Sequence, residues 1–323
     1  MRALLFLTLL LAGQASAVEV LTTVKPLQLI ANAITRGGEP AGLLLKPGTS
    51  PHDYALKPSD LRRIQQADLV IWVGPDLEGF LTPLLANRGN SLALMPLLPS
   101  EQQHRDEHGH HDEDEHGHHD DHQGDEPAHD NGKIVIAQHE AHAHDEHDHG
   151  DRDPHIWLDP HNGLAIARLI AERLGELDPD NLDRYQHNLA LFESKLHETD
   201  ARVTERLAPA RGKGYFVFHD AYGYWEAHYQ IPSLGYFTVN PERAPGAQTV
   251  ARIHQALKQA NAECVFAEPQ FRPAVINAVV RDTQARVAVL DPLASDIQDG
   301  AEGYFDFMFK LANDMAVCLL NER

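Results

Sequence analysis

Residues 62–85 read RRIQQADLVIWVGPDLEGFLTPLL, and this stretch holds the pattern that decides the fold. A polar helical pattern leads into a short apolar run at 69–73, and a Gly-Pro turn separates that run from a second helical pattern. Residues 254–280, HQALKQANAECVFAEPQFRPAVINAVV, repeat this order at low identity. Continuous apolar strands that alternate with helices are typical of parallel sheets with both faces covered. The sequence therefore predicts an α/β protein and hints at two related halves.

A long helical pattern lies between the halves, at residues 178–210. Its apolar residues recur at helical spacing, with a polar gap at Thr199. They are Leu182, Tyr185, Leu189, Phe192, Leu196, Val203 and Leu207. A helix of roughly thirty residues spans about 40 Å at about 1.5 Å per residue. We therefore expect two parallel-sheet α/β lobes, at 18–177 and 211–323, joined by one rigid linker helix; a coiled-coil dimer seam is the alternative.

A histidine-rich acidic segment runs from Glu101 to Asp153 inside the first of these lobes. It holds fourteen of the 22 histidines and eighteen acidic residues against three basic ones, a local net charge of −15 out of −21. Such a composition cannot build a packed core, so we expect a disordered loop. Imidazole and carboxylate are ligands of borderline divalent metals, zinc above all. The segment predicts an auxiliary metal-capturing loop, and the alternative is a solvated linker. Its histidines are His104, His108, His110, His111, His116, His118, His119, His122, His129, His139, His142, His144, His147 and His149.

The first seventeen residues, MRALLFLTLLLAGQASA, have the features of a secretory leader: a basic Arg2, an apolar run and small residues at the end. Cleavage is expected after Ala17, which gives an exported protein. Outside the acidic segment the net charge is only −6, and no basic cluster suggests a nucleic-acid partner. In an exported chain the two cysteines, Cys264 and Cys318, favour a disulfide over two separate buried thiols.

Eight histidines lie outside the acidic segment, and three of them stand where a strand or tight loop gives way to a helix. These are His52, His155 and His219. In open α/β sheets, ligands bind in the crevice at the carboxyl ends of the strands, where three such imidazoles can converge. Each one alone could equally be a surface or hydrogen-bonded histidine. The other five lie in helical patterns, and only for His161, after Pro160 at a helix start, does a ligand role stay open.

Asp291 also ends an apolar strand, in the run VAVLDPLASDI, and Pro292 prevents that strand from continuing. Its carboxylate is a candidate fourth ligand, or a hydrogen-bond acceptor that orients an imidazole. The alternative is a helix-cap or turn residue.

Five stretches together resemble the ZnuA-type zinc-binding proteins, the periplasmic solute-binding components of bacterial high-affinity zinc ABC importers. In order, they are KPGTSPHDYALKPSD (46–60), DPHIWLDP (153–160), YFVFHDAYGYW (215–225), ECVFAEPQF (263–271) and VLDPL (289–293). The resemblance covers essentially the whole chain after the leader. It implies two α/β lobes on a rigid helix, zinc in the cleft between them, and no enzymatic activity. It further implies that the protein is a monomer and delivers zinc to a membrane permease, which works with a cytoplasmic ATPase. The protein would meet the membrane only at the permease.

The resemblance also assigns residues. The family's three cleft histidines fall on His52, His155 and His219, and its disulfide falls on Cys264 and Cys318. Some members have a glutamate before the first histidine, but Pro51 stands there in this chain. That leaves Asp291, water or a loop histidine as the fourth ligand. Members that handle manganese replace one histidine by a carboxylate, so a histidine at position 219 favours zinc.

Two other functions compete with zinc capture. Three histidines with an open fourth position are also the layout of a catalytic zinc site, so a secreted zinc-dependent hydrolase is the main alternative. Against it, the chain has no HExxH helix and no GxSxG elbow. Glu268 is the best carboxylate candidate for a base, and the alternative for this residue is a turn or salt-bridge role. A surface adhesin, a role given to some relatives, is the third hypothesis.

Overall fold

The computed structural model describes residues 18–99, 129–130, 133–135, 152–238, 246–260, 262–269 and 273–322. Its helices are α1 (Lys25–Ile34), α2 (Pro58–Gln66), α3 (Thr82–Leu85), α4 (Pro160–Leu177), α5 (Leu182–Leu207), α6 (Gly223–Tyr229), α7 (Ala247–Ala260), α8 (Pro273–Val280) and α9 (Gly303–Leu319). Its strands are β1 (Val20–Thr22), β2 (Gly42–Leu43), β3 (Leu69–Trp72), β4 (Ser91–Ala93), β5 (His129–Asp130), β6 (Lys133–Val135), β7 (Tyr215–His219), β8 (Gly235–Thr238), β9 (Cys264–Ala267) and β10 (Arg286–Val289). The predicted leader, residues 1–17, lies outside the described residues.

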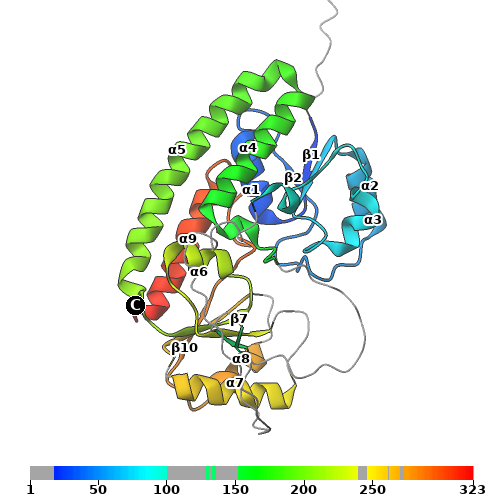
Figure 1. Cartoon of the computed structure of the whole chain (residues 1–323). Coiled ribbons are helices and arrows are strands. Elements are labelled where there is room, and N and C mark those ends of the chain that lie inside the picture. Colours follow the sequence, from blue (N-terminus) through cyan, green and yellow to red (C-terminus); the bar gives the residue numbers. More distant parts are fainter. Residues whose placement is uncertain are drawn as a thin grey trace, which may run out of the picture.

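The strands form two sheets, one in each lobe (Figure 1). The first sheet has the order β2-β1-β3-β4, and all its pairs are parallel. The second sheet contains β8-β7-β9-β10, again parallel, so its four main strands repeat the order of the first sheet. The α/β prediction is therefore confirmed. The shared strand order supports the two related halves that the paired sequence stretches suggested.

The acidic segment contributes two short strands, which the expectation of a disordered loop did not include. Strand β6 pairs in parallel with β8, and β5 pairs antiparallel with β6, which extends the second sheet rather than the first. The physical reason lies in residues 133–136, KIVI, because β-branched residues favour strands and this is the one such run in the segment. The rest of the segment up to Asp151 lies outside the described residues.

Helix α5 runs along one side of the molecule from the lobe of the first sheet to the lobe of the second, with α9 beside it (Figure 1). Its buried residues include Tyr185, Phe192 and Val203, so the predicted apolar stripe faces inward. That stripe packs against α1, α4 and α9 of the same chain, which already cover the face that a coiled-coil partner would need. Helix α9 in turn contacts both α1 and β10, so two helices rather than one connect the lobes.

A single apolar core extends through both lobes. It joins side chains of the first sheet, such as Ile71, to side chains of the second, such as Val217 and Phe266, through α5 and α9. Two smaller clusters cover the outer faces, one beneath α2 and α3 and one beneath α7 and α8. Because close-packed cores are not continuously deformable, we infer that the lobes have little freedom to move against each other.

The disulfide prediction is confirmed. Cys264 of β9 is bonded to Cys318 of α9, with the two Cα atoms 6.2 Å apart. This bond fixes the second sheet to the helix that reaches the first lobe. Among the residues described, no helix is long and apolar enough to cross a membrane.

Candidate metal centre

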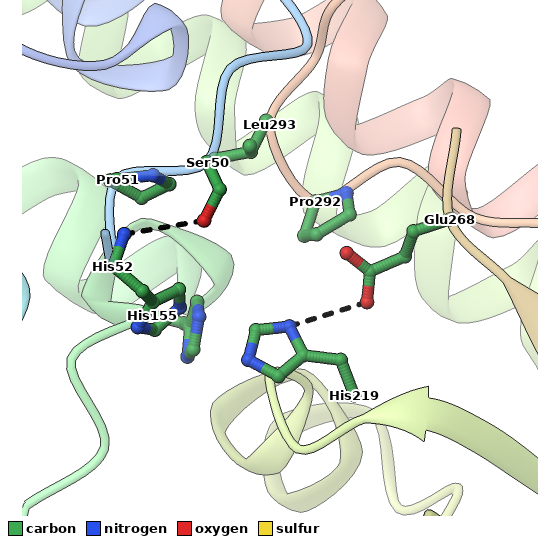
Figure 2. Close-up of a pocket in the computed structure, with 8 residues that line it drawn as sticks. All are labelled: Ser50, Pro51, His52, His155, His219, Glu268, Pro292 and Leu293. Atoms are coloured by element: carbon green, nitrogen blue, oxygen red, sulfur yellow. Dashed lines mark hydrogen bonds and ion pairs between the residues drawn. The ribbon is translucent and has the colours of Figure 1, made fainter. Parts of the chain in front are cut away.

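His52 reaches the boundary between the lobes from the loop that connects β2 to α2. Its backbone N–H donates a hydrogen bond to Ser50 Oγ at 3.3 Å (Figure 2). This bond closes a tight turn of the chain around Pro51. Its ring is partly buried and lines a pocket together with the other two predicted histidines.

His155 comes from a second segment of the first lobe, immediately before the 3-10 helix Ile156–Leu158. Its ring Nδ1 lies 2.7 Å from Asp153 Oδ1, and the same oxygen accepts a hydrogen bond from the His155 backbone N–H at 2.9 Å. The carboxylate thus fixes the ring and leaves Nε2 for another partner. Trp157, two residues on, donates its indole N–H to Pro292 O in the second lobe at 2.8 Å, which ties this segment across the boundary.

His219 is the last residue of β7, the predicted position at the carboxyl end of a strand of the second sheet. Its Nδ1 lies 3.3 Å from Glu268 Oε1 (Figure 2), and Glu268 follows the neighbouring strand β9. Both side chains are buried. Among the residues that the structure describes, His219 Nε2 has no hydrogen-bond partner although the atom is buried. A buried nitrogen in this state fits an ion as its missing partner.

The three imidazoles converge from three segments and both lobes. Their ring centroids lie 5.4 Å (His52–His155), 5.0 Å (His52–His219) and 4.9 Å (His155–His219) apart. One nitrogen of each ring lies within 4.8 Å of the others. Zinc–nitrogen bonds of about 2.0 Å place tetrahedral ligands roughly 3.3 Å apart, so small side-chain rotations would close the gap. The pocket between the rings has room for roughly one water-sized sphere, about the size of a single ion.

The electrostatics of the centre suit a cation. Burial and the neighbouring His219 lower the pKa of His155 well below 6.5, which keeps this imidazole neutral and able to act as a ligand. Burial raises the pKa of Glu268, although the nearby His219 opposes that shift. Three imidazoles can supply three neutral nitrogen ligands, while Asp153 is hydrogen-bonded to one of them and the Glu268 carboxylate lies in ion-pair range of another.

Asp291 stands outside this cluster. Its Oδ1 accepts from Leu293 N at 3.0 Å and its Oδ2 from Ser295 N at 2.6 Å, so it serves the turn after β10. This is the turn role that the sequence left open as the alternative. Glu268, considered from the sequence as a base for a hydrolase or as a turn or salt-bridge residue, lines the pocket and contacts His219 directly.

The sequence did not single out the roles of Asp153 and Glu268. The spacing of Asp153 to His155 was a usable signal, because an aspartate commonly accepts a hydrogen bond from the backbone two residues on. For Glu268 no local signal existed, because its contact depends on β9 lying next to β7. The fourteen histidines of the acidic segment lie outside the described residues, except for the backbone of His129 in β5.

The family model described as "Zinc-uptake complex component A periplasmic" matches residues 20–318. The chain belongs to this family. It is 44% identical to the "High-affinity zinc uptake system protein ZnuA" of Yersinia pestis over 324 residues, which cover 98% of this chain and 97% of that protein. The protein of the same description from Haemophilus ducreyi is 38% identical over 317 residues, with 97% of each chain covered.

A solved structure gives the same answer for the fold of this family member. The crystal structure of ZnuA is 25% identical, covers 93% of this chain and 100% of its own, and superposes with a TM-score of 0.65. The family description refers to a transport component of the periplasm, which agrees with the expectation of an exported, non-enzymatic binding protein.

Proposed function

We propose that this chain is a periplasmic high-affinity zinc-binding protein that captures Zn²⁺ and delivers it to the membrane permease of an ABC importer. A cytoplasmic ATPase would drive the permease. In this proposal His52, His155 and His219 are the zinc ligands, and residues 1–17 are the leader removed after Ala17. The lobes are residues 18–177 and 211–323, with 178–210 as the linker, except that the strands at 129–130 and 133–135 join the sheet of the second lobe.

The observation that carries the proposal is the convergence of three imidazoles at the lobe boundary, with ligand nitrogens within 4.8 Å of one another. Three neutral nitrogens with one remaining position suit tetrahedral zinc, whereas oxygen-rich sites suit magnesium, calcium or manganese. Copper would outcompete zinc on affinity alone, so selectivity must rest on geometry and availability.

The way in which each histidine is supported favours tight binding. Asp153 and Glu268 orient two of the rings, and such carboxylate partners raise the affinity of a histidine for metal. The shared core and the Trp157–Pro292 hydrogen bond hold both sides of the boundary in place. A preformed centre spends little ordering entropy on binding, which helps explain how a soluble carrier can hold zinc tightly.

Glu268 is also the residue on which a hydrolase would depend, and its position argues against that role. Its oxygen faces Nδ1 of His219 at 3.3 Å, and its side chain is almost fully buried. A general base needs to reach a substrate or water in the open position. Glu268 lines the same pocket, but its carboxylate is engaged with the proposed ligand His219, which supports a binding protein over an enzyme.

The histidine-rich segment is proposed to collect zinc near this centre. Its local charge of −15 draws cations, and it leads directly into His155. The role of the segment can be tested by deletion. Deleting the whole of 104–149 would also remove β5 and β6 from the second sheet, so smaller deletions are needed. Two separate deletions, 104–128 and 136–149, take away thirteen of the fourteen histidines and leave both strands.

The experiment compares zinc titrations of the full chain and of the chain with both deletions, with a fluorescent zinc chelator as competitor. We expect the deletions to abolish several weak sites and to keep one tight site with an unchanged dissociation constant. Loss of the tight site in the deleted, folded protein would place high-affinity binding in the segment and contradict the proposal.

Delivery needs its own measurement. Vesicles that contain the permease and ATPase of the same genome should accumulate zinc when the loaded chain is added with ATP. If free zinc at the same total concentration were taken up equally fast, the chain would not be the carrier.

A further inference from the structure

A second group of metal-ligating side chains lies outside the three-histidine centre. Asp159 and His161 stand at the start of α4, and His228 stands on α6 of the other lobe. One ligand atom from each lies within 4.8 Å of the others. The rings of His161 and His228 have their centroids 4.9 Å apart at an interplanar angle of 69°. The three residues are called the outer cluster below.

A fourth side chain supports the outer cluster from the linker helix. Asp200 of α5 places its Oδ1 2.9 Å from Nε2 of His228. Asp159 Oδ1 lies 3.3 Å from Nδ1 of His161 and also accepts from the His161 backbone N–H at 2.6 Å. Asp200 thus supports His228 from behind, the arrangement that orients histidine ligands in metal sites, while Asp159 is itself one of the three candidate ligands. Two carboxylates also offset the charge of a divalent ion next to a helix N-terminus, where the helix dipole would oppose a cation.

The outer cluster is open to solvent on one side and framed by protein on the other. The side chain of His161 is 79% exposed, whereas those of Asp159 and His228 are 20% and 15% exposed. An ion could therefore enter from solvent and meet ligands whose backbones are fixed on helices. Loop ligands would first have to be ordered, whereas these are already in place.

The same two chain segments that carry ligands of the three-histidine centre continue into the outer cluster. Asp159 follows His155 by four residues across the 3-10 helix Ile156–Leu158, and His228 follows His219 by nine residues through α6. The 3-10 helix and α6 are in contact. Both clusters thus depend on the same packing of the two lobes. The three-histidine centre lies inside the boundary between the lobes, and the outer cluster lies at its edge.

We propose that Asp159, His161 and His228, with Asp200 behind His228, bind a second divalent metal ion with the ligand preferences of zinc. Two imidazole nitrogens and a carboxylate oxygen leave one position for water, a mixed donor set that suits Zn²⁺. Bound there, the ion links the start of α4 in the first lobe to α6 in the second. Because the outer cluster is exposed and less supported, this ion exchanges more readily than one at the three-histidine centre.

The test follows individual histidine rings in solution. The full chain is labelled with ¹⁵N-histidine, and long-range ¹H–¹⁵N correlation spectra are recorded as ZnCl₂ is added. The variants His161→Gln and His228→Gln assign the two rings of the outer cluster. His187→Gln and His197→Gln assign two control rings, which are exposed on α5.

We expect the rings of His161 and His228 to respond together, at zinc concentrations at least roughly tenfold below those that affect the controls, because ligands held on one frame act at high effective concentration. In His161→Gln the His228 ring should lose this early response, and the reverse should hold in His228→Gln. His187→Gln should leave both responses unchanged.

Two results would overturn the proposal. One is a response of His161 and His228 only together with the controls; the other is an unchanged His228 response in His161→Gln. Either would leave the Asp200–His228 contact as an ion pair between helices. A failure of the proposed zinc capture would look different, because the rings of His52, His155 and His219 would then not change with the first equivalent of zinc.

Discussion

The three-histidine centre and the outer cluster each bring three candidate ligand atoms within 4.8 Å of one another, yet they differ in what surrounds them. His155 and His219 are only 2% and 3% exposed, and the apolar core that joins the lobes lies directly beneath them. In the outer cluster His161 points largely into solvent. We therefore expect burial, carboxylate partners and a fixed frame to make the three-histidine centre the tighter of the two.

The largest expected effect comes from removing a ligand of the three-histidine centre. His52→Ala, His155→Ala or His219→Ala should weaken tight zinc binding on the order of 10²–10³-fold, because about 10–16 kcal/mol of binding energy is shared among about four ligands. His187→Ala is the matched control, since this histidine is exposed on α5. Competition against a chelator of known affinity measures the change. Tight binding that survives in all three variants would assign it elsewhere.

A smaller effect is expected from the carboxylates behind the ligands. Asp153→Asn and Glu268→Gln keep the shape of the side chain but remove the charge that orients His155 and His219. Partners of this kind typically contribute about 10–100-fold to metal affinity. Asp291→Asn should change zinc affinity less than either, because the Asp291 carboxylate serves a backbone turn. If Asp291→Asn gave the largest loss of the three, Asp291 would be a ligand after all.

The smallest effect contrasts the two clusters by pH, in protein freed of metal. Burial and the adjacent His219 lower the pKa of His155, so the unfolded chain binds a proton more readily than the folded one below about pH 6.5. The contribution of His155 to stability should therefore fall as the pH drops below that value. The slope is at most about 1.4 kcal/mol per pH unit for one group.

His228 should behave in the opposite sense. Burial lowers its pKa, but the hydrogen bond to Asp200 and the charges of Asp200 and Asp159 outweigh burial and raise it. Its contribution is fully present below the ordinary value of about 6.5 and is lost as the pH rises through the raised pKa.

Urea unfolding between about pH 5 and about pH 8, with a chelator present, measures both slopes. His155→Gln should reduce the loss of stability on the acid side, and His228→Gln should reduce the loss toward neutral pH. Equal pH profiles for His155→Gln and the unaltered chain would contradict the assigned environment of His155.

Much of this architecture follows from the sequence. Apolar strands between helical patterns gave the α/β class, and histidines at junctions before helices gave the three residues that converge, of which His219 alone ends a strand. Contacts between elements that are distant in the chain could not be predicted from the sequence. Helix α9 is apolar over much of its surface, but nothing in residues 303–319 says that it packs along α5. Glu268 meets His219 only because β9 pairs with β7, and strand order is not encoded in local periodicity.

The outer cluster likewise could not be predicted from local sequence patterns. The sequence left a ligand role open for His161 but placed His228 a turn or more inside its helix, with no reason to pair the two. Their rings meet because α6 packs against the 3-10 helix Ile156–Leu158 that leads into α4, a packing that joins residues 67 positions apart. Local patterns identify ligands at strand ends more readily than ligands that meet across a helix contact.

One measurement tests the central claim most directly. Crystals of the full chain loaded with one equivalent of zinc are measured at the zinc absorption edge, so that anomalous scattering locates the ion. The account predicts one dominant peak bonded to nitrogens of His52, His155 and His219, with the outer cluster at most weakly occupied. A dominant peak elsewhere, with none between these three rings, would contradict it.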